Sequence, residues 1–446
     1  MQTHHQAHGH GPGHAHDHGH SHVAEDMLSV EEAFQRIMSS FSPLEPEEKP
    51  LLECLGQVLA ADVTSPLDLP PLANSGMDGY AVIHEDIRGA SGDSPKQLRV
   101  IGTVAAGQVS TQNLVPGAAI RIMTGAPVPP GADTVVPFEE TDEVERRRSG
   151  RPLDYIAIRA ELPPRCNVRP AGEDVRQGQL VLERGTVLRA AEMGVLASLG
   201  LERATVIRRP VVAILSTGDE LTPLGQALGP GKIYDSNSFS VAASVLAAGG
   251  IPRVLGIAGD NLDDMHRKLR EVPGSDLLVT SAGVSKGDYD IVKDVLTQNG
   301  DINFWSVRMR PAKPLAFGHL HYSPGKPVPL LGLPGNPVSA MVAFEMFGRP
   351  AIRTMLGRAP LARPVVEGIL TGPIYNSDGR RVYARVEVKR RGGVYYASPT
   401  GPQGSNILTS MSRANGLAIC PADVPSQAAG DKVRIIMLDW NEEVDT

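Results

Sequence analysis

The sequence predicts a multidomain α/β plus β protein with a central, doubly wound and mostly parallel α/β domain and small β domains attached to it. The chain has 446 residues, enough for about three domains of roughly 100–200 residues each. From Pro210 onward, short apolar runs alternate with helical patterns, which is typical of a parallel sheet covered on both faces. Residues 97–164 and the chain after Arg358 carry alternating strand patterns separated by Gly and Pro, which predicts small β domains.

Four short apolar runs predict the parallel strands of the central domain, and small or polar residues follow each of them. The runs are residues 211–215, 254–258, 277–280 and 329–333. The last run leads into Asn336 and Pro337, which fit the N-cap and the first position of a helix that ends near Met355. Another helix is predicted near the start of the chain, where Ser29 and Glu32 fit a capping box.

The loops after two of these strands predict a binding pocket. Loops at the carboxyl ends of parallel strands lie together, and ligands bind there. The two loops are residues 281–290, which contain the cation Lys286, and residues 334–339, which begin a helix. Arg310 and Lys313 stand between them in the sequence. Because a helix N-terminus attracts anions, loops and cations together predict a pocket for a phosphorylated or oxyanion ligand.

Several other residues have two interpretations in the sequence alone. Asp78 is flanked by glycines and is either an ordinary turn residue or a functional acid. Thr124 either contacts a phosphate or caps a turn. Glu192 stands in the first turn of a predicted helix over 190–199, where the helix dipole alone favours an acid. The charged stretch 141–150 predicts an exposed hairpin tip.

The composition argues against some classes of partner. A formal net charge of −7 and an aromatic content of 4% argue against a nucleic-acid partner. No apolar run reaches the ~18–20 residues of a membrane helix, and the polar N-terminus has no signal-peptide pattern. Three widely spaced cysteines suit a reducing compartment, so a cytoplasmic location is predicted. They are Cys54, Cys166 and Cys420.

The N-terminal segment is rich in histidine. Residues 1–22 contain nine histidines among Gly, Ala, Pro and Asp, a composition that cannot bury enough surface to fold. Its spaced imidazoles are typical ligands of a transition metal. The segment is therefore either a metal-binding tail or a solvated one.

Six motifs, in their order along the chain, match a known protein family. They are residues 74–81, 123–127, 172–174, 234–237, 332–339 and 400–405, among them Asn-Ser-Gly-Met-Asp-Gly-Tyr-Ala, Met-Thr-Gly-Ala-Pro and Gly-Leu-Pro-Gly-Asn-Pro-Val-Ser. With these motifs the chain resembles the molybdopterin molybdenumtransferases, the MoeA/gephyrin E-domain family, over about residues 27–440. Each motif alone is weak, and their shared order carries the resemblance.

The resemblance implies an elongated homodimer of four-domain subunits, with a central α/β domain of the molybdopterin-binding type. The composition predicts a disordered His-rich tail over 1–26. The resemblance implies the α/β domain over 27–45 and 206–358, a linking α+β domain over 46–65 and 165–205, a small β domain forming the dimer arm over 66–164, and a C-terminal β-barrel domain over 359–446.

The reaction that the resemblance implies is the insertion of molybdate into adenylylated molybdopterin with release of AMP, the final step of molybdenum cofactor biosynthesis. Mg²⁺ is the implied cofactor. Molybdopterin adenylyltransferase and molybdoenzyme maturation proteins are the implied partners besides the second subunit. The sequence does not distinguish molybdate from tungstate.

The resemblance also assigns site residues. The implied catalytic residues are Asp78, Thr124, Asp174, Glu192, Asp235 and Asp290, of which Asp235 and Asp290 would hold Mg²⁺. The implied substrate-binding residues are Ser285, Lys286, Arg310, Lys313, Pro334, Asn336, Pro337, Arg380 and Ser405.

Two positions depart from the family pattern. Ala282 and Ala312 stand where the family usually has glycine. Alanine tolerates a positive φ poorly, and its methyl group blocks close approach of a ligand. Two other functions stay open: a molybdopterin adenylyltransferase, whose loop typically reads Gly-Gly-Thr-Gly rather than the Ala-Gly-Val-Ser of residues 282–285, and a gephyrin-like scaffold that binds peptides.

Overall fold

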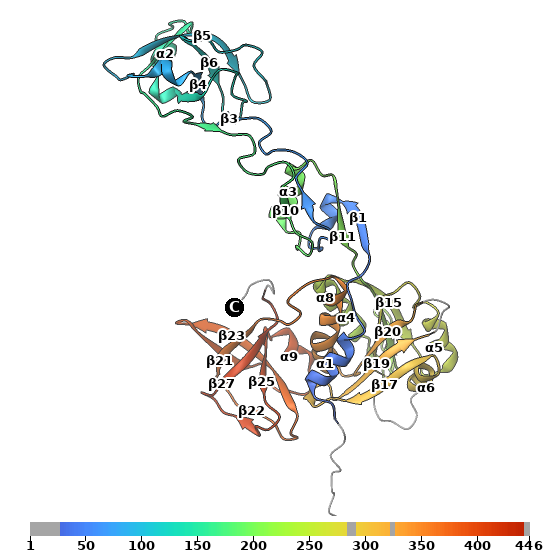
Figure 1. The fold of residues 1–446 in the computed structure, drawn as a ribbon. Coiled ribbons are helices and arrows are strands. Elements are labelled where there is room, and N and C mark those ends of the chain that lie inside the picture. Colours follow the sequence, from blue (N-terminus) through green and yellow to red (C-terminus); the bar gives the residue numbers. More distant parts are fainter. Residues whose placement is uncertain (1–26, 283–290, 322–325, 441–446) are drawn as a thin grey trace, which may run out of the picture. The chain divides into compact units, whose positions relative to one another are not determined.

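The structure is a computed structural model that describes residues 27–282, 291–321 and 326–440 (Figure 1). It has two compact units, each described by itself below. The larger unit comprises Met1–Leu44 and Arg209–Thr446, and the smaller unit comprises Glu45–Arg208. In the described part of the chain, no helix has both the length and the apolar character needed to cross a membrane.

A six-stranded sheet forms the centre of the larger unit. Its strand order is β15-β12-β16-β20-β19-β17, in which the first four strands are parallel and the last two antiparallel. The strands are β12 (Val211–Thr217), β15 (Ile251–Ala258), β16 (Leu277–Ser281), β17 (Gly300–Ser306), β19 (Pro314–Leu320) and β20 (Val328–Leu333). In register, Ile214 pairs with Val254 on one side and with Val279 on the other. The prediction of a mostly parallel sheet is confirmed.

Helices cover both faces of this sheet because successive strand residues point to opposite sides. Val212 and Ile214 pack in one core with α4 (Asn237–Ala248). Ala213 and Leu215 pack in another core with α5 (Leu262–Leu269) and α6 (Ile291–Gln298). The doubly wound arrangement is therefore as predicted (Figure 1).

Two further helical segments pack on the α4 face. Helix α1 (Val30–Met38) begins with the predicted capping box, in which Ser29 and Glu32 exchange hydrogen bonds. The predicted helix from Pro337 to Met355 is present as α7 (Pro337–Ala343), a π-helical turn η4 (Phe344–Gly348) and α8 (Arg349–Met355). Asn336 is its N-cap residue, although its side chain makes no capping hydrogen bond. Side chains of α1, α7, η4 and α8 share one core with the sheet.

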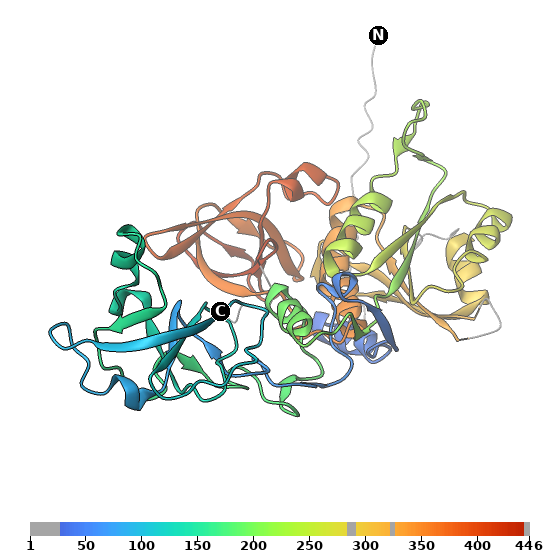
Figure 2. The ribbon, with the colours of Figure 1, turned by 90° about the horizontal axis from the view of Figure 1, so that it is seen from above.

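The C-terminal part of the larger unit is a β-barrel, as predicted. Its strands follow the order β18-β23-β24-β21-β27-β25, and β25 pairs with β23 to close the barrel, which Figure 2 shows in orange and red. The elements are β18 (Met309–Arg310), β21 (Val365–Leu370), β22 (Ile374–Tyr375), β23 (Arg381–Arg391), β24 (Val394–Pro399), α9 (Leu408–Ser412), β25 (Gly416–Cys420), β26 (Ser426–Gln427) and β27 (Lys432–Met437). A short parallel pair, β13 (Leu221–Thr222) with β14 (Ile233–Tyr234), extends from the α/β part.

The smaller unit contains a five-stranded sheet of order β7-β4-β6-β5-β8. Its strands are β4 (Gly79–Val82), β5 (Lys96–Val104), β6 (Ala118–Ile122), β7 (Thr134–Pro137) and β8 (Tyr155–Ile158). The rest of the unit consists of strand pairs and short helices. They are β1 (Pro46–Pro50) with β11 (Arg203–Ile207), β2 (Val63–Thr64) with β10 (Leu180–Leu182), β3 (Asn74–Ser75) with β9 (Val168–Arg169), η1 (Leu51–Cys54), η2 (His84–Ile87), η3 (Phe138–Glu140), α2 (Glu143–Arg148) and α3 (Ala190–Ser198).

The expectation of a hairpin tip at residues 141–150 is wrong, because a helix, α2, forms there. Its first residue, Glu143, is buried with 2% of its surface exposed. The Glu143 carboxylate accepts hydrogen bonds from the Tyr80 hydroxyl at 2.5 Å and from the side chains of Arg121 and Arg147 at 2.7–3.2 Å. Because Glu143 is anchored in this way, the charged stretch 141–150 is held against the sheet and does not project from it.

This buried carboxylate predicts sensitivity of the smaller unit to acid. Burial raises the pKa of Glu143, but hydrogen bonds from Arg121, Tyr80 and Arg147 outweigh it and hold that pKa below the ordinary value of 4.5. A group with a lowered folded-state pKa contributes stability above its unfolded pKa and loses it as the pH falls through the folded value. We expect Glu143→Gln to lower the melting temperature at pH 7 but to weaken its decline below about pH 4.5. Circular dichroism melts of both proteins measure this, and parallel pH profiles would contradict it.

Candidate functional site

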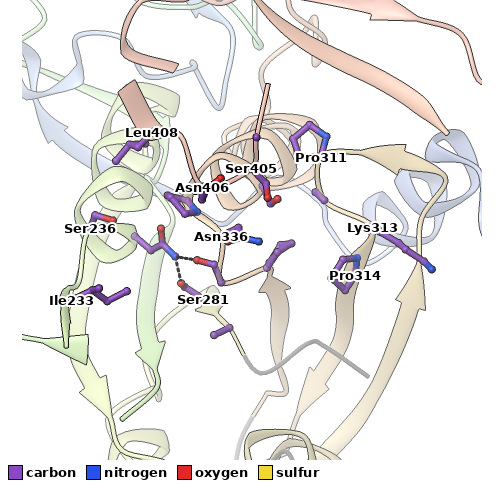
Figure 3. A pocket seen from close by; sticks show the side chains of 18 of the residues that line it. Ile233, Ser236, Ser281, Pro311, Lys313, Pro314, Asn336, Ser405, Asn406 and Leu408 are labelled. Atoms are coloured by element: carbon purple, nitrogen blue, oxygen red, sulfur yellow. Dashed lines mark hydrogen bonds between the residues drawn. The ribbon is translucent and has the colours of Figure 1, made fainter. Parts of the chain in front are cut away.

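A pocket of about 1190 Å³ lies in the larger unit, where the loops after β12, β16 and β20 meet residues of the barrel (Figure 3). The structure brings together eight of the residues predicted from the sequence. These pocket-lining residues are Asp235, Arg310, Lys313, Pro334, Asn336, Pro337, Arg380 and Ser405. Ser285, Lys286 and Asp290 lie outside the described residues. The pocket therefore stands at the carboxyl edge of the parallel strands, where the strand order favours ligand binding.

One wall of the pocket is held by Asn237, a residue not singled out from the sequence. Its Nδ2 donates hydrogen bonds to Ser281 Oγ and to the Gly335 carbonyl oxygen, both at 2.7 Å, and Figure 3 marks the two bonds with dashed lines. Ser281 ends β16 and Gly335 follows β20, so one amide group joins the ends of two neighbouring strands. The sequence signal was its place in the Tyr-Asp-Ser-Asn motif.

Asp235 is buried beside this wall, with 5% of its surface exposed. Its Oδ1 accepts hydrogen bonds from Ser216 Oγ and from the Ser238 backbone N–H, both at 3.0 Å. The second bond satisfies a free N–H group in the first turn of α4. In the described part of the chain Oδ2 has no hydrogen-bond partner, so one carboxylate oxygen holds the helix and the other remains for a ligand.

Cations line the opposite side of the pocket. Arg310 donates to Ser377 Oγ at 3.2 Å and to the Tyr375 carbonyl at 3.3 Å, while Arg380 donates to the Met309 carbonyl at 3.3 Å. Lys313 lies at the pocket edge, and in Figure 3 its side chain extends away from Ser405. The cationic side thus faces a side built of amide, hydroxyl and carboxylate groups.

Arg385 is a buried cation next to the pocket whose role the sequence did not reveal. Only 1% of its surface is exposed, and its guanidinium donates to the carbonyls of Gln403 at 3.1 Å and Gly404 at 2.9 Å, and to Ser410 Oγ at 3.0 Å. Burial lowers the pKa of Arg385 to about 10, with a smaller contribution from the charge of Arg310. Arg385 fixes the loop that presents Ser405. The sequence did contain one signal for this residue, because Arg385 is an arginine within an otherwise apolar strand pattern.

Ala282 and Ala312, the two departures from the family pattern, both adopt the glycine-like backbone. Their φ angles are 81° and 76°. Both residues line the pocket, and Ala312 also belongs to the apolar core with 4% of its surface exposed. The chain therefore keeps a conformation there that costs an L-residue about 1–2 kcal/mol.

These angles predict the effect of glycine at the two positions. We expect Ala282→Gly to stabilise the protein by up to about 1 kcal/mol, because strain relief exceeds the added freedom of the unfolded chain. Ala312→Gly is expected to be close to neutral, because it also removes a buried methyl group worth about 1 kcal/mol. Denaturant titrations measure both. A destabilisation by Ala282→Gly as large as that of glycine in a strand interior would contradict the interpretation.

The smaller unit holds the other four predicted residues. Thr124 donates from its backbone N–H at 2.6 Å and from its hydroxyl at 2.8 Å to Asp78 Oδ1, and these bonds hold the pKa of Asp78 below its ordinary value. Glu192 accepts from the backbone and guanidinium of Arg189 and thereby caps helix α3. Asp174 is exposed and makes no side-chain hydrogen bond or ion pair to a described residue. Asp78 and Thr124 are thus joined by two hydrogen bonds, whereas the contacts of Glu192 are those of a helix cap.

Three family models match successive parts of the chain. The MoeA N-terminal region (domain I and II) matches residues 28–200, a probable molybdopterin binding domain matches 213–354, and the MoeA C-terminal region (domain IV) matches 367–438.

Known proteins that match nearly the whole length of this chain point to the same family as these models. The chain is 38% identical to a molybdopterin molybdenumtransferase 2 of Mycobacterium tuberculosis over 416 residues, which cover 92% of this chain and 99% of that protein. It is 32% identical to a molybdopterin molybdenumtransferase of Bacillus subtilis, over 92% and 94% of the two chains. The crystal structure of a molybdopterin biosynthesis MoeA protein from Pyrococcus horikoshii superposes with a TM-score of 0.78 at 30% identity, over 93% of this chain and 100% of that one.

Proposed function

The chain belongs to the MoeA family of molybdopterin molybdenumtransferases, and we propose that it inserts molybdate into adenylylated molybdopterin with release of AMP. The proposed substrate and the release of AMP are supported by the pocket of the larger unit, which has one cationic side and one side of amide and hydroxyl groups. Its cationic side suits an oxyanion and phosphates, and its amide and hydroxyl side suits a neutral heterocycle. A volume of about 1190 Å³ accommodates a pterin nucleotide together with an oxyanion.

The main requirement that the substrates place on the pocket is compensation of their negative charge. Molybdate is a dianion, and the adenylylated pterin carries a phosphate linker. Arg310 and Arg380 would bind oxygens of these groups through forked guanidinium donors, and Lys313 would act as a point charge. In a partly dry pocket each attraction exceeds its value in water. Ser405, held in place by Arg385 through its loop, would donate to an oxygen of the molybdate, and Ser285 is proposed to do the same.

The donor set in the pocket fits Mg²⁺. This ion prefers oxygen ligands and is usually held by one or two carboxylates plus substrate phosphates. Oδ2 of Asp235 is such a ligand, and Asp290 is the proposed second one. Among described residues no group of three or more metal-ligating side chains exists, so the substrate would supply further ligands. When bound, the ion would shield phosphate charge during release of AMP.

Asp78 and Thr124 are proposed as further functional residues. The two hydrogen bonds from Thr124 keep the Asp78 carboxylate ionised and fixed on an exposed loop of the smaller unit. We propose that it positions substrate or metal, with Asp174 and Glu192 in supporting roles.

The activity is tested with the purified full chain, adenylylated molybdopterin and sodium molybdate. AMP, measured by chromatography, should appear only with molybdate present and should stop when EDTA removes divalent cations. ATP with metal-free molybdopterin is the control for the adenylyltransferase reaction and should not be consumed. AMP release without molybdate, or consumption of ATP, would overturn the proposal.

Self-association as a homodimer is also proposed, and helix α4 supports it. The helix contains no charged residue, yet Phe239 is 54% and Leu246 is 62% exposed. The neighbouring edge strand β15 exposes Ile251 and Val254 as well. An exposed apolar face of this kind is typical of a protein interface.

We expect Phe239→Glu combined with Leu246→Glu to convert a dimer into a monomer, because charges cannot be buried in an apolar interface without a large cost. Light scattering coupled to size-exclusion chromatography measures the mass. Val394→Glu, at an exposed position of the barrel, is the matched control and should leave the mass unchanged. A double variant that elutes with the wild-type mass would remove α4 from the interface.

Two further assignments, the location and the role of the His-rich segment, are also proposals. The cytoplasmic location is supported by three cysteines that form no disulfide. The His-rich segment over 1–22 is proposed to bind a transition metal, and calorimetric titration of Zn²⁺ into the full chain and into a chain that lacks these residues tests this.

A further inference from the structure

Asp378 connects the two arginines of the pocket. It lies in the turn between β22 and β23, and its Oδ2 accepts a hydrogen bond from Arg380 Nη2. The same oxygen stands 3.8 Å from Arg310 Nη1. Arg310 and Arg380 line the pocket, whereas Asp378 does not. One carboxylate oxygen therefore contacts both pocket cations without being part of the pocket lining.

The carboxylate is ionised when it makes these contacts. Its side chain is 34% exposed, and those of Arg310 and Arg380 are 31% and 19% exposed. Burial raises the pKa of Asp378, but the hydrogen bond from Arg380 and the charges of both arginines outweigh it, so that the pKa is lower than usual. Near neutral pH a charge of −1 thus stands beside a charge of +2.

This arrangement has two physical effects on an anion in the pocket. It restricts the positions of two long side chains, which lowers the entropy lost when they bind an oxyanion. It also offsets one of their two charges, which weakens the attraction for every anion that enters. The first effect favours productive geometry, and the second limits affinity.

We propose that Asp378 is a positioning residue for molybdate insertion, which holds Arg310 and Arg380 in place and keeps the affinity of the pocket for dianions moderate. The inference rests on the proposed function of this pocket. Asp378 is not among the residues that line the pocket and would act through the two arginines. The sequence does not single it out, because a single Asp in an Asp-Gly turn is an ordinary turn residue.

The test uses the full chain and compares Asp378→Asn, Asp378→Ala and Asp378→Glu with the wild type. Glu387→Gln is the charge-matched control, because Glu387 is an exposed carboxylate of the same barrel that pairs with Lys389. For each protein, kcat and KM for molybdate are measured from AMP release at low and at high salt. Inhibition by sulfate, an inert dianion, is measured in parallel.

We expect Asp378→Asn to lower the KM for molybdate and the inhibition constant of sulfate by about two- to fivefold at low salt, the upper part of the range for a partly exposed charge pair. The difference should shrink at high salt, because ions screen it. Asp378→Ala, which also removes the hydrogen-bond acceptor, should lower kcat by about tenfold. Asp378→Glu should restore the weak inhibition by sulfate.

Two results would overturn the inference. In one, all three variants and Glu387→Gln share the wild-type kinetic constants and salt dependence. In the other, the variants differ only in melting temperature, which is the result expected of a purely structural residue. A wild-type protein that releases no AMP in response to molybdate would instead overturn the proposed function, so the two failures are distinguishable.

Discussion

Replacing Lys313 by alanine is expected to lower molybdate-dependent release of AMP by at least about 100-fold, the usual effect of removing a fixed electrostatic stabiliser of a reacting group. Lys313 lines the pocket and lies in the turn between β18 and β19, directly after Ala312. Its removal leaves a dianion and a phosphate linker with fewer compensating charges. The melting temperature should change by only a few degrees.

Two further variants make this experiment specific. Lys313→Arg keeps the charge and should retain much of the activity. Lys389→Ala, an exposed lysine of the barrel with 58% of its side chain exposed, should behave as the wild type. If Lys313→Ala retained full turnover, the cationic side of the pocket would not be the site of insertion, whatever the remaining residues do.

Replacing Arg385 by alanine is expected to destabilise the barrel by about 3 kcal/mol or more. The substitution removes a buried charge and leaves the part-buried carbonyl groups of Gln403 and Gly404 without this donor, where a lost hydrogen bond to a charged group costs about 1.5–3 kcal/mol. Arg385→Lys keeps a cation but cannot donate to several carbonyls in a forked geometry. It should therefore fold with reduced stability and reduced turnover, because the loop that presents Ser405 is less well held.

The position of two tryptophans allows this loss to be located. Trp440 packs against Tyr395 in the barrel, with ring centroids 5.6 Å apart, whereas Trp305 belongs to strand β17 of the sheet. In a Trp305→Phe background, denaturant titration followed by fluorescence reports on the barrel. A midpoint for Arg385→Ala equal to that of the background protein would show that the guanidinium is dispensable.

The fold could be predicted from the sequence because its signals are local. Apolar runs such as 211–215 form strands that are buried on both faces, and their short length and β-branched residues distinguish them from buried helices. The capping box at Ser29 and the proline after Asn336 fix two helix starts within four residues of sequence. These patterns depend on neighbours along the chain, so no tertiary knowledge was needed.

The site could be predicted only in part, because its remaining features depend on contacts between distant residues. The pocket edge followed from parallel topology, Arg310 and Lys313 from their place between the two loops, and Arg380 from the resemblance. Arg385 reaches a loop 17–19 residues away, and Glu143 meets Tyr80 across 63 residues, so neither contact leaves a local pattern. Ser285, Lys286 and Asp290 stay predictions, as do the domain boundaries and the roles of Asp174 and Glu192.

The π-helical turn at Phe344–Gly348 has a consequence for how this chain tolerates change in length. A π turn carries one residue more than an α turn, so the faces of the helix before and after it are out of phase by about 100°. Val338 of α7 and Ile352 of α8, on either side of this turn, both belong to one core. Gly348 is fixed by the same geometry, since a β-carbon there would stand 2.6 Å from the Phe344 ring. Deleting a single residue in this turn would rotate α8 as a whole, so homologous chains should keep the number of residues here and a glycine at the position of Gly348.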